Sequence, residues 1–574
     1  MDAFKNMKTI KPAFWLANAQ EACERLAYFG IRAILPLMMV SVGTGGLGLD
    51  MAQKGIIYGV WAFIQCIIPM VSGGFAESFG YKKSLIVAFI INTCGYLLMA
   101  NILNVATIIS GSTEINTTIN FILMFIAGCT IGVGTAIFKP PVQGIVARSL
   151  NKKNSGFGFG LFYWVVNIGG FLAPMAASAL RGSSDAPTWH YVFYGAAFVT
   201  LFNLLITLLF FKEPNHAVDD ESKEAIDVEN ASSDDKAETP SNEATEAKLA
   251  DADAKPSETE TKKPVSQDKV HKSAWQVLTE TLGTLWHDKM ILVFLLIVSG
   301  FWLMFMQLWD LLPNFIDEWV DRRGVGNFLA QAGIFNSFLE ADGSLKPVMI
   351  INIDSAAIIL FVLPLSAFFS RYKMMTSLIL GMTLSVIGFV MSGLTMSGSV
   401  VCLAIFIFAI GEIICSPKFN EYIGMTAPKD KKAIYMGFSN IPFAIGWGLG
   451  NIISGPLYKV LSSKTTLATK FLVENGANKA SLEDKPITDL MPMVQEVLEK
   501  QNGTAYDSYQ ATQVLWEMYS PWTIWLILGA IGLLSMIGMF YFYFKSGMAS
   551  KDNANDNAND EVKKEAVKEE ALAS

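Results

Sequence analysis

The chain has 574 residues, of which 52% are hydrophobic and only 16% are charged, and its mean hydropathy is +0.39. A soluble globule cannot bury so much apolar surface, so the composition excludes a soluble protein and indicates one that crosses a membrane several times. The net charge of −8 comes mainly from two hydrophilic stretches, near 213–272 and 551–574, so it says nothing about the substrate.

The first hydrophobic segment, about residues 13–41, carries a stripe of polar and charged side chains along one face of a helix. The stripe consists of Glu21, Glu24, Arg25, Tyr28 and Arg32. A charge at the centre of a spanning helix costs roughly 2.5–3.5 kcal/mol on insertion scales. The stripe is therefore predicted to face protein or a water-filled cavity, where the charges pair with one another.

Twelve segments satisfy the requirement of about 20 mostly apolar residues for a membrane span. Six precede a hydrophilic linker and six follow it, so the predicted fold is all-α, with six-helix bundles at 1–211 and at 286–458 plus 521–545. The predicted spans are 13–41, 54–76, 84–105, 118–146, 156–179, 190–211, 289–313, 348–369, 374–395, 400–424, 433–458 and 521–545.

Three stretches are predicted to lie outside the bundles. The linker, 212–285, and the tail, 546–574, are rich in acidic residues, Ala and Lys and poor in aromatic residues, which is typical of disorder. The insertion, 459–520, separates the last two spans and contains apolar residues at helical spacing. We expect an amphipathic helix there, with an apolar face made by Leu490, Met493, Val494, Val497 and Leu498.

The short loops between the spans predict the orientation, because Lys and Arg concentrate in cytoplasmic loops. Basic residues gather on the side that holds both termini and the linker; they include Lys82, Lys83, Arg148, Lys152, Lys153, Arg371 and Lys373. The short loops on the other side have almost none. Both termini and the linker are therefore predicted to be cytoplasmic, in a multi-pass protein of the inner, or plasma, membrane.

Five short motifs resemble those of a known family. Residues 73–83, GGFAESFGYKK, resemble the loop motif that follows span two in the major facilitator superfamily. Four motifs of the proton-dependent oligopeptide transporter family, a branch of that superfamily, resemble 21–30 (EACERLAYFG), 132–140 (GVGTAIFKP), 162–170 (FYWVVNIGG) and 411–417 (GEIICSP). The chain resembles a divergent member of this family, which implies two six-helix halves packed around a site near the middle of the membrane.

The resemblance implies that one group of charges couples proton movement to transport. These residues are Glu21, Glu24, Arg25 and Lys139. The physical basis is that a carboxyl group in a site of low dielectric constant holds its proton more firmly when a neighbouring cation moves away. The alternative is a network of ion pairs that only fixes how the helices pack.

The resemblance also implies a binding site for a short peptide. Arg32 and Lys139 would bind the carboxyl end, because a guanidinium can hold a carboxylate with two parallel hydrogen bonds. Glu412 and Asn167 would bind the amino end, and Tyr28 would form part of a side-chain pocket. For Asn167, the alternative is a hydrogen bond between helices in a glycine-rich seam.

Two positions in spans seven and eight depart from the family pattern. Met306 replaces the acid expected in span seven, and Asp310, one turn later on the same face, is the candidate gating partner of Arg32. Ser355 stands where an Asn is expected in span eight, next to Asp354. These departures leave open whether the substrate is an ordinary di- or tripeptide.

The sequence thus predicts a proton-coupled symporter that imports di- and tripeptides or related short peptides by alternating access. The expected partners are the substrate, protons and the bilayer, and no nucleic acid is expected. The proton gradient takes the place of a cofactor. The protein is expected to be a monomer. One alternative is a transporter of the same fold for a modified amino acid, a cell-wall peptide or a drug, and another is a non-transporting membrane sensor. An enzyme is not expected, because none of the four histidines accompanies Ser, Cys or acids in a catalytic arrangement.

Overall fold

The protein is built almost entirely of helices. The computed structural model describes residues 11–42, 45–150, 155–182, 188–212, 279, 283–333, 336–369, 371–428, 435, 437–482 and 485–548. Within these ranges every regular element is a helix, apart from two isolated β-bridges. The all-α prediction is confirmed. The predicted linker and tail fall largely outside the described residues, so their disorder stays a prediction.

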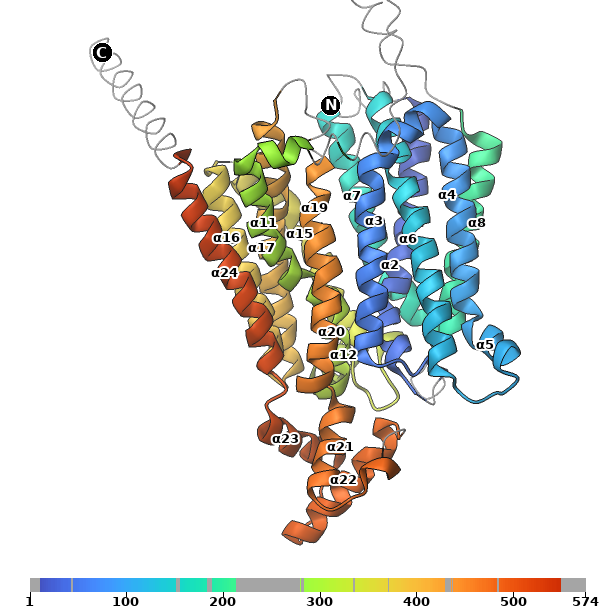
Figure 1. The fold of residues 1–574 in the computed structure, drawn as a ribbon, viewed down its shortest axis with the longest axis vertical. Helices are drawn as coiled ribbons and strands as arrows, with labels where there is room; N and C mark the ends of the chain where they lie inside the picture. Colours follow the sequence, from blue (N-terminus) through green and yellow to red (C-terminus); the bar gives the residue numbers. More distant parts are fainter. Residues whose placement is uncertain are drawn as a thin grey trace, which may run out of the picture.

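The helices form two bundles that stand side by side (Figure 1). The N-terminal bundle consists of α2 (Pro12–Val40), α3 (Met51–Phe79), α4 (Tyr81–Ala100), α5 (Ile102–Ser110), α6 (Thr117–Arg148), α7 (Ser155–Arg181) and α8 (Trp189–Phe210). The C-terminal bundle consists of α11 (Lys289–Asp310), α12 (Leu312–Trp319), α13 (Arg323–Gln331), η1 (Asn336–Phe338), α14 (Pro347–Ile351), α15 (Ile353–Phe369), α16 (Met374–Gly393), α17 (Gly398–Thr426), α19 (Asn440–Phe443), η2 (Ala444–Leu449), α20 (Gly450–Leu461) and α24 (Thr523–Lys545).

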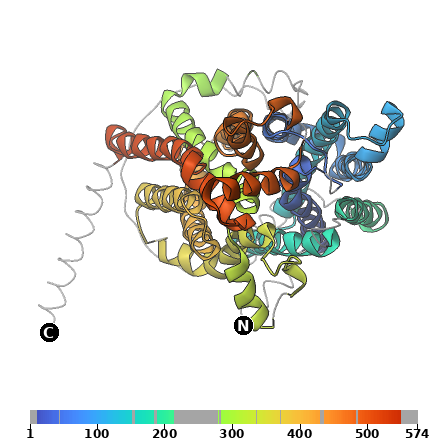
Figure 2. The same cartoon turned by 90° about the horizontal axis from the view of Figure 1, so that it is seen from below.

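The insertion between α20 and α24 is a small helical unit at one end of the molecule. It contains α21 (Lys464–Glu474), η3 (Lys479–Ser481), α22 (Ile487–Asn502) and α23 (Ser508–Tyr519). Helix α22 includes the predicted amphipathic segment, with Leu490, Val494 and Leu498 buried. Seen from this end, α21–α23 lie over the C-terminal bundle (Figure 2). We call this end the insertion face, and the opposite end, where α2 begins and α24 ends, the terminal face.

Nine helices in the described part of the chain are long and apolar enough to cross a membrane. They belong to α3, α4, α6, α8, α11, α14 with α15, α16, α17 and α24. Helices α2 and α7 and the run from α19 to α20 extend alongside them in the bundles (Figure 1). The multi-pass fold is confirmed, whereas the count of twelve spans stays a prediction.

The two bundles meet along two seams. In one, η2 and α20 pack against α3; in the other, α14 and α15 pack against α7. The first seam is very close near the insertion face, because a methyl group at Gly55 would lie only 3.2 Å from Cα of Gly455. Small residues at such a contact let helix backbones approach each other.

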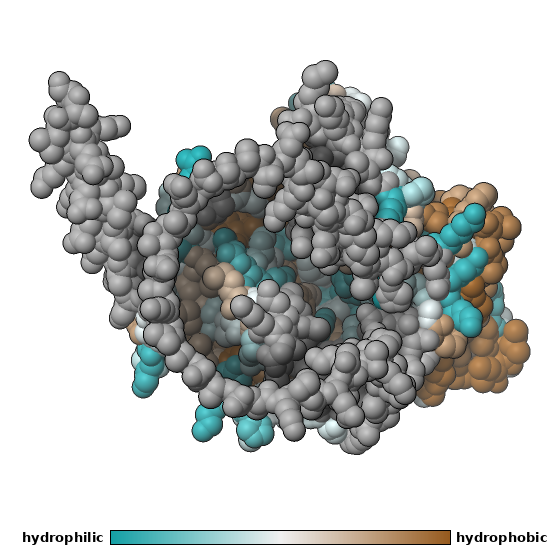
Figure 3. Space-filling model, turned by 90° about the horizontal axis from the view of Figure 1, so that it is seen from above, coloured by the Kyte–Doolittle hydropathy of each residue, from teal (hydrophilic) through white to brown (hydrophobic). Residues whose placement is uncertain are grey.

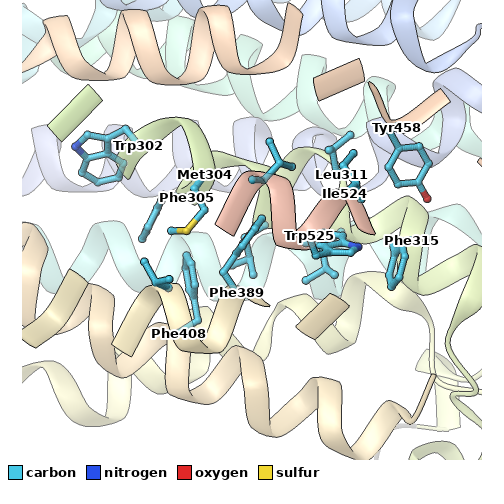
Figure 4. Close-up of a cluster of buried hydrophobic side chains, with 14 of the residues drawn as sticks. Trp302, Met304, Phe305, Leu311, Phe315, Phe389, Phe408, Tyr458, Ile524 and Trp525 are labelled. Atoms are coloured by element: carbon cyan, nitrogen blue, oxygen red, sulfur yellow. The ribbon is translucent and has the colours of Figure 1, made fainter. Parts of the chain in front are cut away.

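The core of the C-terminal bundle is rich in aromatic side chains (Figure 4). Phe305 packs against Phe408 with ring centroids 4.6 Å apart, and Phe389 packs against Trp525 at 4.9 Å. Trp302 lies against Phe305 at 4.7 Å. Both Trp302 and Phe305 also line the cavity between the bundles, so this core fixes one wall of the candidate site.

Candidate functional site

A cavity of about 430 Å³ lies between the two bundles. Among the described residues, the charged lining is divided by sign: the N-terminal bundle contributes cations and the C-terminal bundle contributes acids. These residues are Arg25, Arg32, Lys139, Asp354 and Glu412. Seen from the terminal face, hydrophilic residues are visible beside apolar ones in the central region that grey atoms leave uncovered (Figure 3).

The stripe on α2 supplies an ion-pair cluster next to the cavity. Arg25 Nε lies 3.1 Å from Glu21 Oε1, and the Arg25 guanidinium also contacts the Glu24 carboxylate. All three side chains are buried. Lys139, on α6 just before Pro140, lies within electrostatic range of these groups. Four charges from two helices therefore share one desolvated region.

Tyr28 and Asn167 lie on the cavity wall. The Tyr28 hydroxyl donates a hydrogen bond of 2.8 Å to Gln65 Oε1 on α3, and the Arg25 guanidinium lies 5.4 Å from the centre of the Tyr28 ring. Asn167 comes from α7 and faces the same cavity. Both side chains are therefore within reach of a molecule bound there.

Arg32 closes the N-terminal wall toward the insertion face. Its Nη2 lies 2.5 Å from Asp310 Oδ1. The guanidinium lies between two aromatic rings, 4.5 Å from the centre of Tyr58 and 4.6 Å from that of Trp447. Such cation–π contacts strengthen when water is excluded. The pair joins α2 of one bundle to α11 of the other.

Asp310 is the centre of a wider set of hydrogen bonds. Its Oδ2 accepts from Trp447 Nε1 and Asn451 Nδ2, both at 2.7 Å. Trp447 lies in η2, a π-helical turn, which is a distortion often found at functional sites. Every oxygen of the buried carboxylate thus has a donor, as a buried charge requires.

Lys54 forms a second buried contact between the bundles. Its Nζ donates to the main-chain oxygen of Asp310 at 2.7 Å and to Asn314 Oδ1 at 2.6 Å. Asn314 Nδ2 in turn donates to the main-chain oxygen of Pro36 at 3.0 Å. At the rim, Lys459 pairs with Asp50 at 2.9 Å, and both side chains are largely exposed. These contacts close the insertion-face end of the cavity.

The structure brings the predicted site residues together. Tyr28, Arg32, Lys139, Asn167 and Glu412 line one cavity, Arg25 lies at its wall beside Glu21 and Glu24, and Asp310 contacts Arg32. Sequence reasoning missed Lys54 and Asn451 and assigned Asp354 no role. Lys54 carried a signal, because an ionisable residue within a predicted span marks a functional position by default.

A family model described as Major Facilitator Superfamily matches residues 21–451. Among curated proteins, the chain is similar to the uncharacterized transporter YclF of Bacillus subtilis (strain 168), with 28% identity over 193 residues, 33% of this chain and 35% of that one. It is also similar to the peptide transporter YePEPT of Yersinia enterocolitica subsp. palearctica serotype O:3 (strain YE-P4), with 28% identity over 197 residues, 33% of this chain and 34% of that one. The matched region thus spans about a third of the length of these relatives.

Solved structures share the fold over nearly the whole chain. A POT family transporter in complex with 5-aminolevulinic acid has a TM-score of 0.57 at 15% identity and covers 93% of this chain and 96% of its own. The nucleoside transporter NupG has a TM-score of 0.56 at 12% identity and covers 93% of this chain and 99% of its own. Identities this low show the fold and do not select a substrate.

Proposed function

The chain belongs to the major facilitator superfamily, a family of transporters and not of enzymes, and we propose that it is a proton-coupled symporter for di- and tripeptides or related short peptides. One observation supports this most: the charged lining of the cavity has opposite signs on its two walls. A short peptide is a zwitterion, so it needs a cationic group at one end of its site and an acid at the other.

In this proposal the N-terminal bundle binds the peptide carboxylate through Arg32 and Lys139. Glu412 binds the ammonium group from the opposite wall, and Asn167 adds a hydrogen bond. Tyr28 lines the space for a side chain. The names of relatives such as the peptide transporter YePEPT support this substrate class.

Proton coupling is assigned to the cluster of Glu21, Glu24, Arg25 and Lys139. Because Arg25 contacts both acids and Lys139 lies nearby, a shift of either cation changes which carboxylate is compensated. An uncompensated carboxylate in a desolvated site takes up a proton. Proton binding and helix movement are thereby linked, and the proton gradient drives transport without a cofactor.

Alternating access is assigned to the contacts at the insertion face. In this proposal the ion pair between Arg32 and Asp310 holds that face closed, which corresponds to a state with access from the terminal face. The basic loops predicted from the sequence lie on the terminal face, so this face and both termini are assigned to the cytoplasm. The state with access from the terminal face is then the inward-open state. We take the protein to be a monomer in the inner membrane. The insertion then lies outside the cell.

A second candidate is a transporter of the same fold for another small zwitterion, such as a modified amino acid. Met306 and Ser355 motivate it, because they line the cavity at the two positions where the family pattern has polar groups. Met306 replaces an acid with an uncharged side chain, and Ser355 replaces Asn with a shorter one. Both changes alter the shape and polarity of the cavity wall.

Uptake into proteoliposomes tests the proposal. Protein-containing vesicles should accumulate labelled dialanine when the outside is made acidic, and unlabelled dipeptides should compete. A proton ionophore should abolish accumulation, and vesicles without protein are the control. If dialanine is not accumulated but a single amino acid derivative is, the second candidate replaces the first.

A further inference from the structure

Two acids of the C-terminal bundle face the cavity together, and only one of them has a role in the proposal above. Asp354 lies on α15 and Glu412 on α17, and both line the cavity. Asp354 has no exposed surface, and neither of its carboxylate oxygens accepts a hydrogen bond from a donor group in the described part of the chain. The same holds for Glu412 Oε2. Buried acids rarely lack donors, so these groups need an explanation.

The two acids come from helices that pack together, and both line the same cavity. Ile358, one turn beyond Asp354, lies in the same buried cluster as Ile413, which follows Glu412, so the two carboxyl groups face the cavity from neighbouring positions. Two ionised carboxylates have no hydrogen to share and repel each other strongly where water is excluded. One proton removes both problems, because the protonated acid donates a hydrogen bond to the other carboxylate. The geometry therefore favours a pair with a total charge of −1.

No cation within the described residues is placed to neutralise this pair. Helix α15 packs against α7, α14 and α17. The described ionisable groups on these three helices, besides Glu412, are Arg181, Cys402, Cys415, Lys418, Glu421 and Tyr422, and the cysteines and Tyr422 carry no positive charge. Helix α17 also packs against α13 and α16; Arg323 on α13 pairs with Asp321 at 2.9 Å, and α16 carries no ionisable group. Arg181 pairs with Glu340 at 3.6 Å, and Lys418 pairs with Glu421 at 2.8 Å. Lys139, across the cavity, interacts with Glu21, Glu24, Arg25 and Cys66.

We propose that Asp354 and Glu412 share one proton in the empty cavity and release it when the ammonium group of a substrate binds between them. The nature of the substrate rests on the proposed function. In this exchange the pair changes from a charge of −1 to −2, the proton leaves to the water of the cavity, and the ammonium group supplies one positive charge and up to three hydrogen bonds. Binding at this end is thus favoured by a rise in pH, opposite to proton uptake at the cluster around Arg25.

Infrared spectroscopy tests the shared proton without any substrate. The purified full-length protein at neutral pH should show the carbonyl stretch of a protonated carboxylic acid, shifted in heavy water. The wild-type minus Asp354→Asn difference spectrum should show the loss of one protonated carboxyl group, because the new amide donates a hydrogen bond to Glu412 and stabilises its ionised form. Glu412→Gln should show the same loss for the same reason and serves as the second variant if the first does not fold.

The matched control is Glu421→Gln, which removes an exposed acid from the same helix, α17, and should leave the band unchanged. A wild-type protein without the band would overturn the proposal. So would a band of unchanged intensity in folded Asp354→Asn and Glu412→Gln, since the proton would then belong to another acid. Glu318, which also holds a proton near neutral pH, contributes equally to all these proteins and cancels in the difference spectra.

Calorimetry of dialanine binding tests the exchange. Titrations in two buffers of different ionisation enthalpy count the protons released, and the wild type should release about one proton more than Asp354→Asn. Equal counts would overturn the exchange. If dialanine binds neither protein, the proposed substrate is wrong, and the infrared band alone decides whether the pair shares a proton.

Discussion

The substitution Asp310→Asn removes the negative charge that closes the insertion face. In the structure this carboxylate pairs with Arg32 at 2.5 Å and accepts hydrogen bonds from Trp447 and Asn451. The asparagine has nearly the same shape and keeps one oxygen acceptor, but it leaves the buried guanidinium without a counter-charge. We therefore expect the state with a closed insertion face to lose stability relative to the state with this face open.

The magnitude follows from the burial of the pair. Removal of one partner from a buried ion pair costs about 3–5 kcal/mol. The remaining oxygen can still accept a hydrogen bond, so we expect the lower value, about 3 kcal/mol, which is a shift of roughly 100-fold in the open-to-closed ratio. The control is Asp50→Asn, which breaks the pair with Lys459. Those side chains are 39% and 47% exposed, so the cost should stay below about 1 kcal/mol, or roughly fivefold.

Hydrogen–deuterium exchange measures this shift without labels. Amides at the insertion-face ends of α2, α3 and α11 should exchange faster in Asp310→Asn, whereas those in the middle of α16 and α17 should not change. The Asp50→Asn variant should resemble the wild type. The gating role of Asp310 would be refuted by equal exchange in the two variants, or by faster exchange throughout the C-terminal bundle, which would indicate loss of the fold.

Two further predictions concern coupling and stability. Lys139→Ala should abolish proton-driven accumulation of dialanine in proteoliposomes while exchange of labelled for unlabelled dialanine continues; a variant that still concentrates dialanine would contradict the coupling role. Burial raises the pKa of Glu318, on α12 outside the predicted spans, from 4.5 to about 7. Between these values the folded protein holds a proton that the unfolded chain has lost, so the contribution of Glu318 to stability should fall by up to about 3 kcal/mol as the pH rises from 4.5 through 7. Glu318→Gln should lack this fall in thermal melts, and an identical pH profile in both proteins would contradict it. Lys464, whose pKa burial lowers to about 8, stays protonated over most of this window.

The helices were predictable because a membrane imposes a length on each apolar segment. The predicted span 118–146 corresponds to α6 at Thr117–Arg148, and 190–211 corresponds to α8 at Trp189–Phe210. The predicted span 433–458 overlaps the continuous helical run of α19, η2 and α20, but the π-helical turn in its middle was not predicted. A π-helical turn depends on contacts with other helices, such as the one from Trp447 to Asp310, and hydropathy does not record them.

The predicted insertion helix was also correct but incomplete. Helices α21 and α23 flank α22, and α23 begins with a capping box formed by Asp507 and Gln510. That pair is visible in the sequence and could have predicted the start of the helix.

The candidate site was predictable where charges stood in the middle of apolar segments, as on α2. It was not predictable where a residue gains its meaning from a distant partner. An ionisable residue in a predicted span marks Lys54 as a position of interest, but its partners, Asp310 and Asn314, are far away in the sequence and only the fold identifies them. Asp354 is similar, because its proximity to Glu412 arises from the packing of α15 against α17.

The position of Arg32 links closure of the insertion face to the strength of substrate binding. Its Nη2 is engaged by Asp310, whereas no group in the described part of the chain accepts a hydrogen bond from its Nη1. In this state the Arg32 guanidinium can donate only some of its hydrogen bonds to a substrate carboxylate, because Asp310 accepts the others. When the insertion face opens and Asp310 withdraws, Arg32 can bind the substrate carboxylate through two parallel hydrogen bonds. Binding should therefore be tighter from the insertion face and weaker once that face has closed. This difference favours release toward the terminal face, the direction that import requires.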